Sequence, residues 1–188
     1  MSSRPLGDRA PLTAGALAGA AAYLVGYVLT YALYSDTVRE SVLARVAALF
    51  GADVTVEMVG WLFYNAHFVP TVVDVDAPIF GGTDAVNFLA RGDAFSPLLY
   101  LVPVLLLVGA GLAVARRHPT PSATDAAVAG GTVVVGYLPL AILGQVRFGV
   151  ATEAARVAPD LVLAVALAGV GYPVVLGALG AVVAHRTA

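Results

Sequence analysis

The residues best suited to chemistry lie close together in one stretch, "EMVGWLFYNAHFVPTVVDVD", at positions 57–76. If the stretch is helical, one face and its margin carry five polar or aromatic side chains: Glu57, Trp61, Tyr64 and Phe68, with His67 beside them. A carboxylate and an imidazole close to two further aspartates could bind a divalent cation or perform acid–base catalysis.

The spacing of these residues matches no zinc motif such as H-E-x-x-H. No Walker A, nucleophile-elbow or dinucleotide glycine pattern is present, and the chain has no cysteine, so we assign no catalytic residue, metal ligand or cofactor. The favoured interpretation is an aromatic helix in the membrane interface, with Glu57 and His67 turned toward water. An enzyme or metal binder that uses Glu57 and His67 is the third-ranked hypothesis for function.

The composition places these residues in a membrane protein. Hydrophobic residues make up 60% of the 188 positions and charged residues only 12%, which is about half the charged fraction of a soluble domain. Acidic residues outnumber basic ones twelve to ten, so nucleic acid is not an expected partner. All the basic residues are arginine, and this Ala/Gly/Val-rich acidic composition suggests a halophilic archaeon.

Four uncharged stretches are long enough to cross a bilayer: residues 11–34, 97–115, 126–145 and 161–184. Backbone groups in lipid must be paired within each segment, so these stretches are expected to be helices. The first is too long for a signal-peptide core of about 7–15 residues and is interpreted as a retained anchor. The prediction is an all-α bundle of four transmembrane helices.

The distribution of arginine orients this bundle. With four spans, segments 1–10, 116–125 and 185–188 lie on one face and hold five arginines, whereas the loop 146–160 holds two. The positive-inside rule then places both termini in the cytoplasm of a multi-pass cell-membrane protein. A fifth span at 54–73 would remove this bias, so the whole region 35–96 is placed outside.

The outer region 35–96 holds eight of the twelve acidic residues. Within it, residues 37–50 are predicted to form an amphipathic helix, because Thr37 and Glu40 have capping-box spacing and Gly51 suits the position after its end. The aromatic segment 54–73 follows. Beyond Pro70 the chain is expected to be irregular.

Two helix faces are predicted packing seams. The first carries Gly15, Gly19, Tyr23, Tyr27 and Tyr31 at helical spacing, and the last span carries Gly169, Pro173 and Gly177. Packing is favoured over a pore lined by tyrosine. Val-Gly-Tyr also occurs three times, ending at Tyr27, Tyr137 and Tyr172.

The four spans contain no Asp, Glu, Lys, Arg or His, which makes ion-coupled transport by this chain alone unexpected. The leading hypothesis is therefore a structural or accessory membrane subunit that associates through its glycine seams, as a homo-oligomer or in a larger complex in the lipid bilayer. The alternative is a channel or facilitator for an uncharged or lipophilic solute.

At "GWLFYNAHFV", residues 60–69, and in its four-span layout with acidic, lysine-free loops, the chain resembles small multi-pass membrane proteins of haloarchaea that have no assigned function. The resemblance implies an archaeal cell membrane and transfers no catalytic residue.

Overall fold

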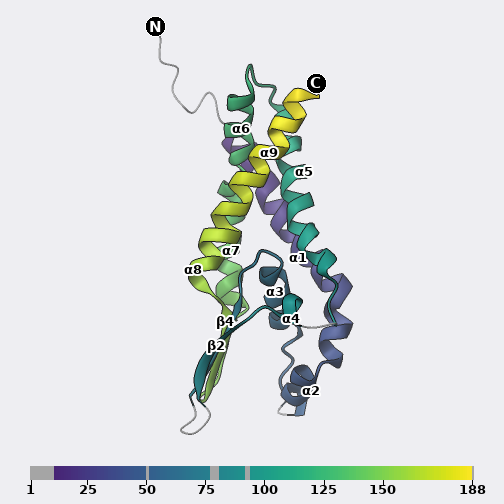
Figure 1. Ribbon diagram of the computed structural model, residues 1–188, viewed down its shortest axis with the longest axis vertical. Helices are drawn as coiled ribbons and strands as arrows, with labels where there is room; N and C mark the ends of the chain where they lie inside the picture. Colours follow the sequence, from purple (N-terminus) through teal and green to yellow (C-terminus); the bar gives the residue numbers. More distant parts are fainter. Residues whose placement is uncertain (1–10, 50, 77–80, 92–93, 188) are drawn as a thin grey trace.

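The computed structural model describes residues 11–49, 51–76, 81–91 and 94–187. Four helical segments in this part of the chain are long and apolar enough to cross a membrane: Leu12–Glu40, Pro97–Arg117, Ala123–Arg147 and Leu161–Arg186. Helix α1 (Leu12–Glu40) begins and α9 (Tyr172–Arg186) ends at the same end of the molecule, and a small sheet lies at the opposite end (Figure 1).

The two middle spans each begin at a serine cap. The hydroxyl of Ser96 accepts a hydrogen bond from the Leu98 amide, ahead of the 3-10 turn η2 (Pro97–Tyr100) and α5 (Leu101–Arg117). Ser122 caps α6 (Ala123–Gly131), which is joined to α7 (Val134–Arg147) by a short turn. A side-chain oxygen at these positions binds amides that have no partner within the helix.

The last span changes its helical geometry midway. It runs from α8 (Leu161–Leu163) through a π-helical stretch, η3 (Ala164–Gly171), into α9. Pro173 follows the π-helical stretch and has no amide hydrogen to bond the preceding turn.

Glycines hold the spans together at short backbone distances. A methyl group at Gly19 of α1 would overlap the Val133 carbonyl oxygen between α6 and α7, and one at Gly111 of α5 would overlap the Gly177 carbonyl oxygen of α9. Gly15 faces Thr132 in the same way. The predicted seam glycines therefore lie in contacts between helices of one chain.

The expectation of an all-α chain is wrong outside the spans. Four strands form an antiparallel sheet in the order β2-β1-β4-β3: β1 (Thr71–Val75), β2 (Gly82–Val86), β3 (Val150–Ala151) and β4 (Ala155–Pro159). The stretch after Pro70 was expected to be irregular, but its run "TVVDV" is rich in β-branched residues and pairs on both sides. One of its partners, β4, comes from the loop between the third and fourth spans.

The predicted helix 37–50 also differs from the structure. Helix α1 continues through Thr37 to Glu40, and α2 (Val42–Leu49) begins after a break at Ser41, whose backbone is extended. The Ser41 hydroxyl accepts from the Ala44 amide at 3.3 Å, so Ser41 rather than Thr37 caps the helix. Residue 50, the predicted end, lies outside the described residues.

The remaining two helices lie between the spans where these separate. Helix α3 (Thr55–Asn65) lies beside α1 and below the point at which α1 and α7 diverge, with α4 (Phe88–Arg91) next to it (Figure 1). The segment 54–73 is therefore neither a fifth span nor a surface helix along most of its length. It fills the end of the bundle.

Candidate functional site

Helix α3 is buried on nearly all sides, although its sequence suggested an interfacial helix. Nine of its eleven residues are buried. The Asp53 carboxylate precedes the helix and accepts from the Thr55 amide at 3.0 Å. Hydrogen bonding from the Thr55 side chain, and then from its amide, lowers the pKa of Asp53. A short helix that is apolar around its circumference is stable only inside a larger structure.

His67 lies just after α3 and is fully buried, so the expectation that it faces water is wrong. Its Nδ1 lies 2.8 Å from the Phe63 carbonyl oxygen, and its Nε2 lies 2.7 Å from the Tyr137 hydroxyl of α7. A carbonyl can only accept, so Nδ1 carries the proton and Nε2 accepts from Tyr137. Burial lowers the pKa of His67 to about 4, which keeps the ring neutral.

Tyr64 connects α3 to the same helix. Its hydroxyl donates to the Ala141 carbonyl oxygen of α7, and the Tyr23 hydroxyl of α1 lies 3.3 Å from the Tyr64 oxygen. Burial raises the pKa of Tyr64. Two buried hydroxyls, those of Tyr23 and Tyr64, therefore join α1, α3 and α7.

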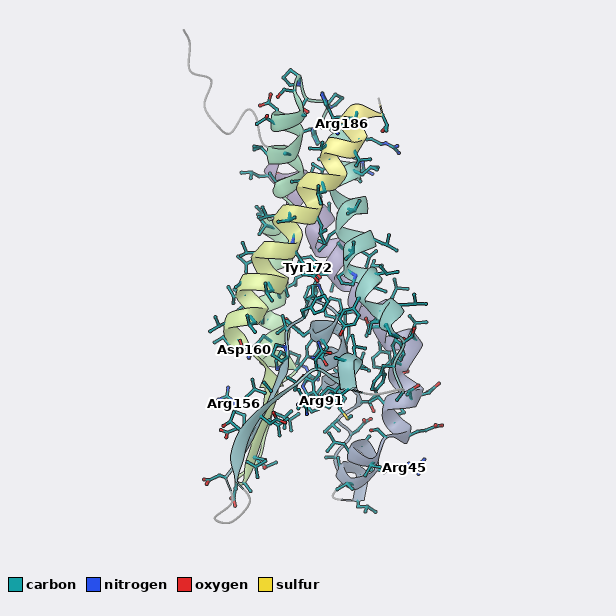
Figure 2. All side chains as sticks on the ribbon, viewed as in Figure 1. Arg45, Arg91, Arg156, Asp160, Tyr172 and Arg186 are labelled. Atoms are coloured by element: carbon teal, nitrogen blue, oxygen red, sulfur yellow. The ribbon has the colours of Figure 1, made fainter. Side chains whose placement is uncertain are left out.

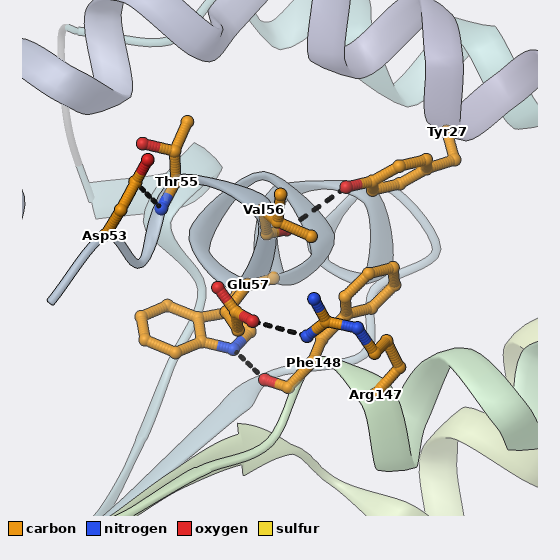
Figure 3. A network of polar contacts seen from close by, with 8 residues as sticks. Tyr27, Asp53, Thr55, Val56, Glu57, Arg147 and Phe148 are labelled. Carbon is orange, nitrogen blue, oxygen red and sulfur yellow. Dashed lines mark hydrogen bonds and ion pairs between the residues drawn. The ribbon is translucent and has the colours of Figure 1, made fainter.

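The outer face of α3 is attached to the end of α7 (Figure 3). Glu57, whose side chain is 15% exposed, forms an ion pair with Arg147, and the Trp61 indole Nε1 donates to the Phe148 carbonyl oxygen at 2.7 Å. On the other side of the helix, the Tyr27 hydroxyl of α1 donates to the Val56 carbonyl oxygen at 3.2 Å. Glu57 is thus a structural partner and not a free carboxylate.

Asn65 connects α3 to β1 and α4. Its Nδ2 donates to the Val69 carbonyl oxygen at 2.9 Å and to the Thr71 hydroxyl of β1 at 3.3 Å. Its Oδ1 accepts from the Phe88 amide of α4 at 2.7 Å. One fully buried side chain therefore satisfies polar groups from three segments.

Replacing this amide should be costly. We expect Asn65→Leu, which keeps the side-chain size, to lower the free energy of unfolding by about 2–4 kcal/mol, because buried groups that lose their partner each cost about 1–3 kcal/mol. The comparison variant Asn87→Leu removes a half-buried side chain that caps α4, accepts from Tyr100 at 3.3 Å and donates to the Asn65 carbonyl oxygen at 3.4 Å. Because water can replace these partly exposed bonds, it should cost only about 1 kcal/mol. Thermal unfolding in a non-ionic detergent measures both, and equal effects would contradict the role given to Asn65.

Phe68 does not belong to this cluster. The sequence placed it on the face of Glu57, Trp61 and Tyr64, but α3 ends at Asn65 and Phe68 has a positive φ of 60°. Its ring is 58% exposed and stacks on Tyr100 with centroids 4.6 Å apart. The helical spacing failed because the helix was shorter than the pattern assumed.

The tyrosines of α1 pack against α3 and its neighbours. Tyr23 makes edge-to-face contacts with Phe63 at 5.1 Å and with Tyr137 at 5.2 Å, and Tyr27 stacks on Phe148 at 5.1 Å. Tyr31 lies farther out and accepts from Arg39 at 3.1 Å. The tyrosine stripe of α1, Tyr23, Tyr27 and Tyr31, is thus an aromatic packing surface.

The three Val-Gly-Tyr sequences share one structural feature. All three tyrosines contact the α3 region: Tyr27 through Val56, Tyr137 through the His67 ring nitrogen, and Tyr172 with its ring 5.2 Å from that of His67. Sequence reasoning noted the repetition but did not connect Tyr137 with His67. The pairing of Arg147 with Glu57, ninety positions apart, left no signal in the local sequence.

The polar groups of this cluster are paired with one another or with the backbone. Within residues 11–49, 51–76, 81–91 and 94–187, no three metal-binding side chains gather, and every buried side-chain nitrogen or oxygen has a hydrogen-bond partner. A neutral histidine bonded on both sides and a carboxylate paired with arginine are suited to fixing one arrangement of α1, α3 and α7.

Comparison with known proteins gives one match. No curated protein and no solved structure matches the chain. One family, described as a family of unknown function, matches residues 1–188. The chain therefore belongs to the family DUF7978.

Proposed function

We propose that this protein is a multi-pass membrane protein that acts as a structural or accessory subunit, with its sheet end as the surface that meets a partner. Four helices of sufficient length and hydropathy support the membrane location. The observation that carries the functional proposal is the burial of α3. The segment richest in reactive side chains uses them all in contacts within the chain.

The charges at the two ends support an orientation with both termini in the cytoplasm. The end at which α5 and α9 finish carries Arg116, Arg117 and Arg186, against one described carboxylate, Asp125. Figure 2 shows Arg186 at this end and Arg45, Arg91 and Arg156 at the other. At that other end the short loop 146–160 holds two arginines, and the arginines of the long region 35–96 count little in the positive-inside rule. Arg4 and Arg9 lie outside the described residues.

The same packing disfavours the two other hypotheses. A channel through one chain along the tyrosine stripe would need space that Phe63, Tyr137 and Phe148 occupy. An enzyme using Glu57 and His67 would need both groups free, but one is paired with Arg147 and the other is bonded at both ring nitrogens.

The sheet is the most suitable partner surface. Its strand β2 lies at an edge and is exposed over Gly82–Ala85, and α2 presents Val42 and Leu49 with 79% and 84% exposure. An exposed strand edge can add a strand from another chain. By contrast, the glycine faces of α1 and α9 are filled by helices of the same chain, so an oligomer would need a different surface.

Site-specific cross-linking tests this proposal. With benzoyl-phenylalanine at Thr83 of β2, we expect irradiation of native membranes to give one discrete cross-linked species, identified by mass spectrometry. The same probe at Leu179, an exposed position on α9, should give none. Absence of a product at Thr83, together with altered solute flux into liposomes in Tyr27→Phe and Tyr31→Phe variants, would overturn the accessory role in favour of a facilitator.

A further inference from the structure

A groove of about 1000 Å³ lies between α1 and α5 at the end of the bundle where the chain termini lie. The described residues that line it belong to these two helices or adjoin them, and the groove is open to its surroundings. Its volume is at the upper end of the range for small-molecule sites, about 300–1,000 Å³.

Glycine packing explains why the two helices separate here. Gly15 and Gly19 hold α1 against the α6–α7 joint, whereas Gly111 and Gly180 hold α5 against α9. Helices α1 and α5 approach each other again deeper in the bundle, where a methyl group at Gly26 would lie 3.3 Å from the Leu106 side chain. The gap is therefore built by contacts that fix each helix to a different neighbour.

The lining of the groove is divided along its length. Twelve of the fifteen lining residues are apolar, and many of them are alanine. The three polar ones, Thr13, Arg117 and His118, all come from the start of α1 or the end of α5 and so lie at one end. An amphiphile has the same division, with an apolar tail and a polar head.

The length of the groove suits a single lipid chain. It follows α1 from Leu12 to Val25, which is about 20 Å at a rise of ~1.5 Å per residue. Half of a hydrocarbon core about 30 Å thick measures about 15 Å. A groove of this length covers one leaflet.

The positive charge at the polar end is available to an anion. Within the described part of the chain, neither Arg117 nor His118 has an acidic partner within 4 Å. Asp125, a nearby carboxylate in sequence, already accepts from the Ser122 hydroxyl at 2.7 Å. Arg116 adds to the local positive potential. Basic pockets between membrane helices on the cytoplasmic side bind anionic head groups.

We propose that this groove binds one anionic phospholipid, with an acyl chain between α1 and α5 and the phosphate at Arg117 and His118. A helix from another chain would fill the apolar walls but would leave the cationic end without a counter-charge. The proposal rests on the membrane location given above and is independent of the accessory role.

Native mass spectrometry of the full chain in mild detergent tests the proposal. After incubation with equal amounts of phosphatidylglycerol and phosphatidylcholine of identical acyl chains, we expect one phosphatidylglycerol to be retained with roughly tenfold preference. Both lipids offer a phosphate to Arg117, but phosphatidylglycerol is a net anion, whereas the choline group of phosphatidylcholine neutralises its phosphate and is repelled by the basic end. Arg117→Gln should abolish the preference. The matched control Arg116→Gln, which changes an adjacent residue outside the groove, should largely keep it.

A second pair of variants tests the apolar part. Ala21→Trp fills the groove and should remove both lipids, whereas Ala32→Trp, at another exposed position of α1, should not. Equal retention of the two lipids by the unmodified chain, or an unchanged preference in Arg117→Gln, would overturn the proposal. The proposal would also be overturned if Ala21→Trp retained its lipid but lost a dimer partner or a bound protein. A missing cross-link at Thr83 would leave this result unaffected and would count only against the accessory role.

Discussion

Gly111→Ala should destabilise the protein by about 2–3 kcal/mol, whereas Gly109→Ala, two residues away on α5, should not. A methyl group at Gly111 would overlap the backbone carbonyl of Gly177, and a backbone atom cannot move aside as a side chain can. Overpacking a tight contact costs about 1–3 kcal/mol. At Gly109 nothing lies within 4 Å, and alanine gains up to about 1 kcal/mol of helix propensity.

The protein carries its own reporter for this measurement. Trp61 is the single tryptophan, and its indole is buried at 2% exposure, so unfolding changes its fluorescence. Thermal or denaturant unfolding in a non-ionic detergent then compares the two variants with the unmodified chain. Equal stability of Gly111→Ala and Gly109→Ala would show that the α5–α9 contact is looser than described.

Acid should destabilise the protein through His67. The pKa of His67 is about 4 in the folded state, against 6.5 for the free side chain, because burial opposes the charged form. The unfolded chain therefore binds a proton first as the pH falls below 6.5. Stability should be constant above that pH and should fall by about 3 kcal/mol between pH 6.5 and 4, at ~1.4 kcal/mol per unit.

Histidine variants separate this effect from the titration of carboxylates. The groups around His67 are the Phe63 carbonyl and the tyrosines Tyr137 and Tyr172, which carry no charge in this pH range. His67→Gln should lower the free energy of unfolding at pH 7. It should also flatten the dependence of that free energy on pH between pH 6.5 and 5. His118→Gln should keep the full slope, and an identical slope in His67→Gln would rule out His67 as its source.

The four long apolar helices could be predicted from the sequence, because hydropathy and small residues are local signals. The four uncharged stretches correspond to the four long apolar helices. Gly19 and Gly177 lie where a close helix approach needs them. The glycine pattern could not reveal which helix packs against each glycine. In the structure, Gly19 and Gly177 both pack against other helices of the same chain.

The sheet and the buried helix α3 could not be predicted in the same way, because they depend on partners that are distant in sequence. Strand β1 pairs with β4, with Thr71 opposite Pro159, and Glu57 pairs with Arg147. The polar residues of α3 were assigned to water because Glu57 and His67 look costly to bury. That cost is offset by Arg147 and Tyr137, which lie seventy or more positions away in sequence.

The pairing of β1 with β4 sets an order on biosynthesis. Thr71 leaves the ribosome 88 positions before its partner Pro159, which at about 5–20 residues per second is a delay of roughly 4–18 s. During that interval the second and third long apolar helices must be translated, while the segment that holds α3 and β1 has neither its strand partner β4 nor the ring of Tyr172. In a nascent chain stopped before residue 150, α3 should therefore be accessible to protease. In the finished and released polypeptide, α3 should be protected.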